Sequence, residues 1–526
     1  MTYTIGAADG EDEVEHYYPL RRVPQAVSQR VLWDHLNVLV RPLAKSVAVS
    51  AVSSLVVSRD PLVRSTLEER ARQSGDAVIS QMQHIYFDNP GLDTVTVRTL
   101  SKLGREIAYF GARILRVQVV LGLDPEGRAA RNLKAIPATG YDALMVTGLA
   151  AGKTLGYFKG GRVLTRLWWD SANPEAPLDL DPGHPKPGVR RYGAPTSLRD
   201  MAADIDDLYW ARAYGQSIKV TRVGEGATRR WLVSLPGTDH AEYATQPNPA
   251  DLEANLREEL NMPNAMRRGT IDAIRTAMYR DGIAPEAMAE EKVFICGHSQ
   301  GGMIAAALAA TPVEEVGVKV DRILTLGSPT RRLRLRDDVV AVAVEHDQDI
   351  VPSLDGTPRR NLDQRVTVQR KLHAPRMNPL FYAHSSLTYT ETVRRMERQR
   401  IVAPFGRTGK AVGALQDYLP KDGEPTRVFH LYVWQELRSE VDRHPWTNMF
   451  DVAAPTGWQP VRYDSEVLID EEVARPAVER IGELAGHVTS VVASSDLVTA
   501  ATRLIEGAGD ETSRDNGEEE NASTVG

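Results

Sequence analysis

The sequence predicts an α/β fold in which a mainly parallel sheet carries helices on both faces. Short apolar, β-favouring runs at 293–296, 320–326 and 339–344 alternate with segments of helical composition. Each run ends in a loop that contains glycine, proline or aspartate. Uniformly apolar runs are typical of strands buried on both faces, and strands that alternate with helices pair in parallel.

The run at 293–296 leads into the most informative segment of the chain. The sequence Gly-His-Ser-Gln-Gly at 297–301 fits the pattern G-x-S-x-G, and Met303–Ala310 is a strong helix former. A strand, a sharp turn and a helix in this order are the context of a nucleophile elbow. Small residues must flank the serine because the two backbones come close there. We therefore predict Ser299 as the nucleophile and Gly297 and Gly301 as the elbow glycines, against the alternative of a structural Gly-Ser turn.

Further strands are predicted on both sides of this segment. The runs 217–223 and 230–235 indicate an antiparallel hairpin joined through Gly224 and Gly226. The run at 426–434 is another strand candidate, whose membership in the sheet the sequence leaves open.

An activated serine requires a base within hydrogen-bond reach and an acid that orients the base. When the order along the chain is serine, acid, histidine, only residues after 299 qualify. Asp349 follows the run at 339–344 and is favoured over Asp347, because the following Ile-Val-Pro makes its loop rigid. His384 is favoured over His373 as the base, because it opens a helical segment.

A developing oxyanion needs two N–H donors, one from the residue after the nucleophile and one from the loop after an earlier strand. Gln300 is the first candidate. The loop Pro-Gly-Thr at 236–238 supplies the second, with Thr238 as the donor and Gly237 permitting a close approach. His298, inside the elbow, is expected to point away from the reaction centre.

These segments together resemble a known family. Pro-Gly-Thr at 236–238, Gly-His-Ser-Gln-Gly-Gly at 297–302, Gly-Ser-Pro at 327–329, Asp-Ile-Val-Pro at 349–352 and the histidine at 384 close to a tyrosine look like the α/β-hydrolase lipases and esterases. The likeness covers about residues 215–400. It is closest to the class 3 type lipases and weaker to the bacterial PGAP1-like hydrolases.

The resemblance implies a role for each candidate residue. Ser299 would be the nucleophile, Asp349 the acid and His384 the base, with Thr238 and Gln300 as oxyanion donors. No metal or organic cofactor is implied. The expected function is a serine hydrolase that cleaves carboxylic esters, lipid or acyl esters above all, through an acyl-enzyme. The alternatives are a thioesterase or acyltransferase, and an interaction or effector protein in which the hydrolase domain is a payload or an inactive scaffold.

The length, net charge and cysteine count of the chain argue against several other classes of function. The chain has 526 residues, a net charge of -7 and one cysteine, Cys296. This charge gives no indication of nucleic-acid binding, and one cysteine excludes an internal disulfide framework. The acidic N-terminus resembles no signal peptide, and 46–58 is too short and polar to span a bilayer. A cytoplasmic protein is therefore expected, with export by a route lacking a cleaved signal left open.

The composition suggests five parts. These are a flexible acidic lead (1–20), a mainly helical region that ends in a proline-rich connector (21–188), the α/β-hydrolase domain (205–400), a C-terminal extension (401–507) and a disordered acidic tail (508–526).

Two features of the sequence indicate partners beyond an ester substrate. An apolar stripe at 100–117 predicts a helix packed within the protein or, as the alternative, against a helix of a second copy or another protein. Four arginines, Arg331, Arg332, Arg334 and Arg336, are expected on a solvated face, with peripheral contact to anionic lipid head groups as the alternative.

Overall fold

The computed structural model describes residues 2–4, 100–105, 116, 120–121, 139–154, 157–174, 192–209, 215–238, 247–357, 365–372, 379–402 and 404–437. Within these ranges the chain forms one nine-stranded sheet, in the order β1-β8-β7-β6-β5-β4-β3-β9-β2. The strands are β1 (Thr2–Thr4), β2 (Gly160–Asp170), β3 (Gln216–Val223), β4 (Arg230–Leu235), β5 (Lys292–His298), β6 (Lys319–Leu326), β7 (Val340–His346), β8 (Arg365–Arg370) and β9 (Thr426–Leu437).

The sheet is mainly parallel. β4 to β8 and the edge strand β1 pair in parallel with one another, whereas β3 pairs antiparallel with β4 and β9, and β9 pairs antiparallel with β2. The hairpin β3–β4 and the strands β5, β6 and β7 lie where the apolar runs predicted them. β9 belongs to the sheet, between β3 and β2, which answers the question that the sequence left open.

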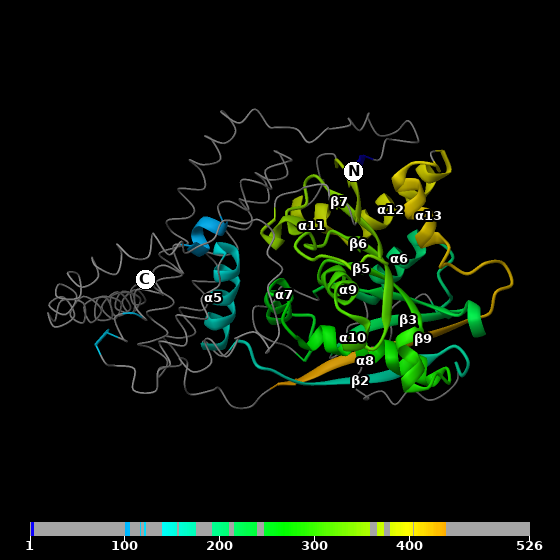
Figure 1. The fold of residues 1–526 in the computed structure, drawn as a ribbon, viewed down its shortest axis with the longest axis horizontal. Helices are drawn as coiled ribbons and strands as arrows, with labels where there is room; N and C mark the ends of the chain where they lie inside the picture. Colours follow the sequence, from blue (N-terminus) through cyan, green and yellow to red (C-terminus); the bar gives the residue numbers. More distant parts are fainter. Residues whose placement is uncertain are drawn as a thin grey trace, which may run out of the picture.

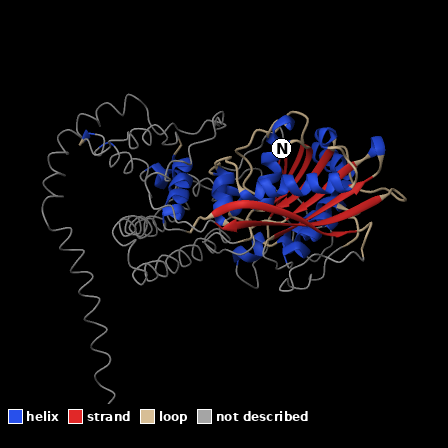
Figure 2. Ribbon diagram, turned by 90° about the horizontal axis from the view of Figure 1, so that it is seen from below, coloured by secondary structure: helices blue, strands red, loops and turns tan. Residues whose placement is uncertain are grey.

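Helices cover both faces of the sheet (Figures 1 and 2). On one face lie α8 (Ala265–Arg280) and α9 (Gln300–Ala310), which pack into the same apolar cluster. On the other face lie α6 (Leu198–Tyr209), α12 (Ser386–Val402) and α13 (Arg407–Gln416). The predicted α/β architecture, that of an α/β-hydrolase, is confirmed.

The central strand β5 shows how the sequence produces these layers. Val293 and Ile295 belong to the cluster under α8 and α9, and Phe294 and Cys296 belong to the cluster under α6 and α12. Successive side chains of a strand point to opposite faces, so a strand covered on both faces must be apolar at every position. The single cysteine is buried and unpaired by any disulfide, as its place in this strand requires.

Two further helices pack against each other beside the helices that cover the sheet. α7 (Leu252–Glu259) precedes α8, and α5 (Gly140–Thr154) packs against α7 through Leu149, Leu256 and Met262. Arg332, in the loop after β6, is paired with Asp142 of α5. The described residues also include α10 (Val313–Val316) and α11 (Pro379–His384), with short 3₁₀ turns at Gly226–Thr228, Pro285–Glu290 and Val351–Asp355.

The common sheet includes strands from outside the residues expected to form the hydrolase domain. β2 comes from the expected helical region 21–188 and β9 from the expected extension 401–507, yet both are strands of the common sheet. The alternating, aromatic-rich stretches of β2 and β9 pair with each other along most of their length. The sheet therefore includes residues on both sides of the span 205–400. Thr2–Thr4 of the expected flexible lead is strand β1, which pairs with β8 through its backbone.

Several other expectations lie outside the described residues. These are most of the apolar stripe at 100–117, the proline-rich connector after residue 174, residues 438–507 of the expected extension and the acidic tail. Among the described helices, none is long and apolar enough to cross a bilayer.

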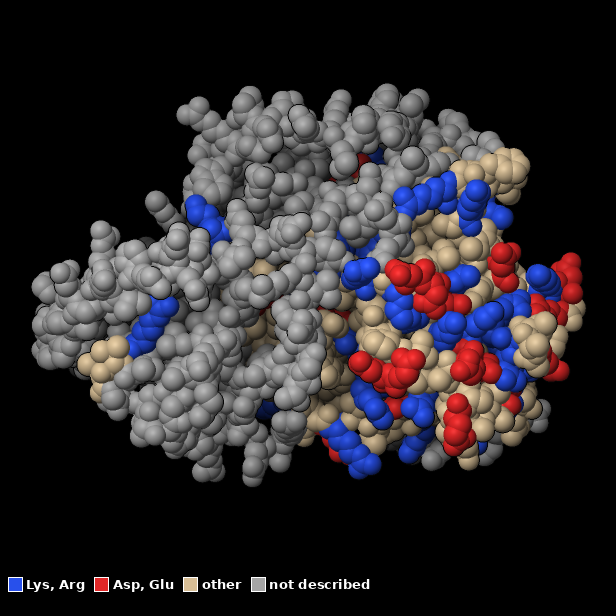
Figure 3. Space-filling model, viewed as in Figure 1, with Lys and Arg blue, Asp and Glu red and all other residues tan. Residues whose placement is uncertain are grey.

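The arginine cluster is largely an internal feature. Arg331 pairs with Glu345 at 2.7 Å, and only 3% of each side chain is exposed. Arg336 donates to the main-chain oxygens of Leu308, Thr311 and Val320. Because buried guanidinium groups need such partners, the expected solvated face is wrong for these side chains. Arg334 is exposed. Elsewhere, Figure 3 shows basic and acidic side chains interspersed over the described surface.

The pair Arg331–Glu345 gives a test of the core. Arg331→Met removes this buried ion pair while the Glu345 carboxylate stays in the core, and should lower the free energy of unfolding by about 3–5 kcal/mol. Arg334→Met, in the same cluster but exposed, should change it by about 0.5 kcal/mol or less. Urea unfolding measures both values. Equal stability of the two variants would contradict the assignment of this ion pair to the core.

Candidate active site

Ser299 occupies the turn between β5 and α9. Its backbone has φ 52° and ψ −121°, and positive φ is uncommon for any residue except glycine. The Ser299 N–H donates to Leu326 O of the neighbouring strand at 2.9 Å, which ties the turn to β6. A backbone conformation of this kind costs about 1–3 kcal/mol and persists only where the surrounding structure enforces it.

The elbow glycines are required by this close approach. A Cβ added at Gly297 would lie 2.4 Å from Gly301 C, and a Cβ added at Gly301 would lie 2.3 Å from Leu235 O. Both contacts are with backbone atoms, so neither can be relieved by turning a side chain. The expected need for small residues on both sides of Ser299 follows from the packing of α9 against the ends of β5 and β4.

The structure brings the favoured acid and base together. Asp349 lies in the loop after β7, and His384 is the last residue of α11. His384 Nδ1 lies 2.8 Å from Asp349 Oδ2. The His384 ring also lies beside the elbow, because its centroid is 4.7 Å from that of His298, the residue before Ser299.

Asp349 is held by two further donors. Tyr389 donates its O–H to Asp349 Oδ2 at 2.7 Å, and the Val351 N–H donates to Oδ1 at 2.9 Å. The carboxylate is fully buried. Burial together with the Asp349 carboxylate raises the pKa of Tyr389 well above its usual value, so this phenol stays a donor. Three donors therefore fix the carboxylate that faces His384.

The alternatives for the acid and base have different surroundings. Asp347, two residues before Asp349, is half-buried, and its N–H donates to Arg370 O. His373 lies outside the described residues. His346 is buried, stacks on Tyr389 with ring centroids 3.9 Å apart, and has its pKa lowered to about 3 by burial. It supports the tyrosine that donates to Asp349.

The expected oxyanion loop lies directly beside Ser299. β4 and β5 pair in parallel with Leu235 opposite Gly297, so residues 236–238 leave the sheet next to the elbow. A Cβ added at Gly237 would lie 2.6 Å from Ser299 Cβ. Gln300 begins α9 and is 1% exposed. The Gly237 N–H donates to Tyr209 Oη at 2.6 Å, which leaves Thr238 as the candidate donor of this loop.

Asn255 of α7 connects the two oxyanion candidates, and no motif of the sequence pointed to it. Its Nδ2 donates to Thr238 Oγ1 at 2.9 Å, and its Oδ1 accepts from Gln300 Nε2 at 2.7 Å. Gln300 Nε2 also donates to Asp251 O. One side-chain amide thus sets the spacing between the loop after β4 and the start of α9.

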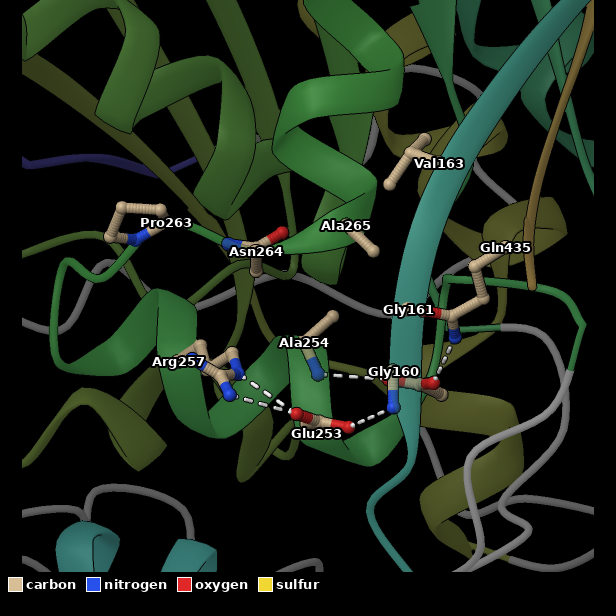
Figure 4. A pocket seen from close by; sticks show the side chains of 11 residues that line it. Gly160, Gly161, Val163, Glu253, Ala254, Arg257, Pro263, Asn264, Ala265 and Gln435 are labelled. Atoms are coloured by element: carbon tan, nitrogen blue, oxygen red, sulfur yellow. Dashed lines mark hydrogen bonds and ion pairs between the residues drawn. The ribbon is translucent and has the colours of Figure 1, made fainter. Parts of the chain in front are cut away.

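The anchoring of α7 explains how Asn255 keeps its place. Asp251 caps α7 by accepting from the Ala254 N–H, and it also accepts from Gln435 Nε2 of β9. Glu253 accepts from the Gly160 N–H of β2 and pairs with Arg257 (Figure 4). These groups line a cavity of about 250 Å³, which has none of the proposed catalytic side chains in its wall.

One expectation about the elbow is wrong. His298 was expected to point away from the reaction centre, but its Nε2 lies 2.8 Å from the main-chain oxygen of His384.

The fold and the strained serine turn define a hydrolase-type α/β domain. Comparison with known families agrees with this class: residues 193–364 match the PGAP1-like alpha/beta domain. The matched span includes Ser299 and Asp349 and ends before His384. It agrees with the resemblance to α/β-hydrolases and to their PGAP1-like branch. No curated protein and no solved structure gives a significant match to the chain.

The link through Asn255 predicts a specific defect. Asn255→Ala removes the support of Thr238 and Gln300, and should slow the reaction of Ser299 with a fluorophosphonate about 10- to 100-fold. Thr238→Val keeps the backbone N–H but loses the hydroxyl, and should show part of this loss. Thr238→Ser keeps the hydroxyl and serves as the matched control. Wild-type labelling rates in Asn255→Ala would contradict the proposed support.

Asp251 predicts a pH dependence of stability. Burial raises the pKa of Asp251 to about 7, against an unfolded value of about 3.9. Between these values the folded chain binds the proton more tightly, so the contribution of Asp251 to stability falls as the pH rises towards 7. Asp251→Asn has no proton to lose. Relative to wild type, its free energy of unfolding should rise by about 2–3 kcal/mol between pH 5 and pH 8.

Urea unfolding at the two pH values measures this difference. Asp422→Asn, at an exposed position, is the control and should follow the pH dependence of the wild type. A constant difference between Asp251→Asn and wild type would rule out titration of Asp251 in this range.

Proposed function

We propose that the protein is a serine hydrolase that cleaves carboxylic esters through Ser299, His384 and Asp349. The observation that carries the proposal is the bond between His384 Nδ1 and a fully buried Asp349, formed beside a serine in a strained turn. The hydrolase-type match over residues 193–364 supports the reaction class. Lipid and other acyl esters are the substrates that the sequence resemblance favours.

The hydrogen bonds of His384 define its role in the proposed reaction. When Nδ1–H donates to Asp349, Nε2 is the basic nitrogen and accepts the proton of Ser299 Oγ. The serine oxygen attacks the ester carbonyl, and the carbonyl electron pair moves onto its oxygen. The main-chain N–H groups of Gln300 and Thr238 are proposed to stabilise this oxyanion.

The second half of the reaction uses the same groups. The imidazolium of His384 returns its proton to the leaving alcohol, which departs and leaves an acyl-Ser299 ester. Water then gives a proton to Nε2 and attacks the acyl carbon, and the carboxylic acid leaves as Ser299 Oγ takes the proton back. Asp349 remains ionised throughout and stabilises the imidazolium. Every proton that is taken up is released, so the cycle needs no other reactant.

If Asp349 is the acid that orients His384, its substitution should lower kcat far more than substitution of the nearby Asp347. Asp349→Asn should lower kcat on p-nitrophenyl esters about 10⁴-fold, because the amide favours the wrong tautomer of His384. Asp347→Asn is the matched control two residues away, and should change kcat less than about threefold. Esters with acyl chains from acetyl to palmitoyl, presented with and without micelles, would identify the preferred chain length. Equal losses in the two variants would argue against Asp349 as the acid.

A further inference from the structure

Three groups next to the proposed catalytic residues form a continuous chain of hydrogen bonds. The Gly237 N–H donates to Tyr209 Oη at 2.6 Å, and Tyr209 Oη lies 2.7 Å from His298 Nδ1. His298 Nε2 lies 2.8 Å from the main-chain oxygen of His384. The chain begins in the oxyanion loop after β4, passes through the last residue of α6 and the elbow, and ends at the proposed base.

The direction of each bond follows from the donors at the two ends. A main-chain oxygen can only accept, so His298 Nε2 must carry the proton that is shared with His384. A neutral imidazole that carries its proton on Nε2 has a lone pair on Nδ1, so the Tyr209 O–H donates to Nδ1. His298 is therefore the neutral Nε2–H tautomer, and Tyr209 selects that tautomer by donating to the other nitrogen.

The surroundings of His298 favour the same state. The side chain is 4% exposed, and its ring meets that of Tyr209 edge-on with centroids 5.8 Å apart. Burial and the neighbouring His384 ring lower the pKa of His298 well below its usual value. A charged imidazole would donate from both nitrogens, so the bond between Tyr209 and Nδ1 would reverse its direction and Tyr209 Oη would have to accept two hydrogen bonds.

We propose that His298 is a positioning residue that couples the oxyanion loop to the base. Its Nε2–H holds the main chain of His384 at the end of α11, and its Nδ1 holds Tyr209 in place to receive the Gly237 N–H. Displacement of either end would misalign the attacking oxygen, the base and the oxyanion donors, although none of the coupling groups touches the substrate. This role rests on the proposed ester hydrolysis.

The test uses variants that each remove one hydrogen bond from this chain of hydrogen bonds. The amide of an asparagine side chain can replace Nδ1, and that of a glutamine side chain can replace Nε2. His298→Asn thus loses the bond to His384 O, whereas His298→Gln can keep it. On the full-length protein, His298→Asn should lower kcat about 10- to 100-fold with KM within about twofold. His298→Gln should recover part of the loss, and Tyr209→Phe should lower kcat in the same way.

The double variant Tyr209→Phe/His298→Asn separates positioning from general damage. Groups that act through one chain should give a double variant about as slow as the slower single variant, rather than a product of both losses. Thermal unfolding of all variants supplies the stability control. Wild-type kcat in His298→Asn, losses that multiply, or losses that follow the melting temperature would each overturn the inference. If His298→Asn does not fold, Tyr209→Phe and His298→Gln provide the same comparison.

Failure of the proposed function is distinguishable from failure of this inference. Wild-type protein that neither hydrolyses esters nor reacts with a fluorophosphonate would overturn both. Wild-type protein that reacts at Ser299, with variants that react at the same rate, would overturn the positioning role alone.

Discussion

The strained turn at Ser299 is the constraint on which the rest of the site depends. The backbone reverses from β5 into α9 at a single residue with positive φ, and the two elements then pack so closely that Gly297 and Gly301 have no room for a side chain. Such strain must be offset by the surrounding packing. This support comes from β5, whose side chains are buried alternately in the two apolar clusters, from the apolar helix α9, and from the hydrogen bond that Ser299 N–H donates to Leu326 O.

The parallel arrangement of the strands brings the other residues of the proposed site to this turn. Because β4, β5, β6 and β7 run in the same direction, the loops that follow them leave the same edge of the sheet. The oxyanion loop, Ser299 and Asp349 are thereby gathered from segments more than a hundred residues apart in sequence, and α11 adds His384. Asn255, Tyr389 and Tyr209 then fix the loops through side-chain hydrogen bonds.

The features of the site that short, contiguous sequence motifs encode could be predicted from the sequence. The elbow, its glycines, the strands around it and the preference for Asp349 and His384 rest on strand-turn-helix order and on loops after strands. Asn255 could not be predicted, because its partners Thr238 and Gln300 are brought to it only by the packing of α7. His298 was misjudged because its direction depends on hydrogen-bond partners in α6 and α11. The pairing of β2 with β9 could not be predicted, because it joins residues some 260 to 280 positions apart.

The most direct measurement of the central claim is reaction of the full-length protein with a fluorophosphonate probe, followed by mass spectrometry of the modified peptide. The account predicts one adduct on Ser299 in the wild type and no adduct in Ser299→Ala, with both proteins folded. Folded wild-type protein that stays unmodified in buffer and in the presence of micelles would contradict an activated serine. An adduct at another residue that persists in Ser299→Ala would place the reactive centre elsewhere.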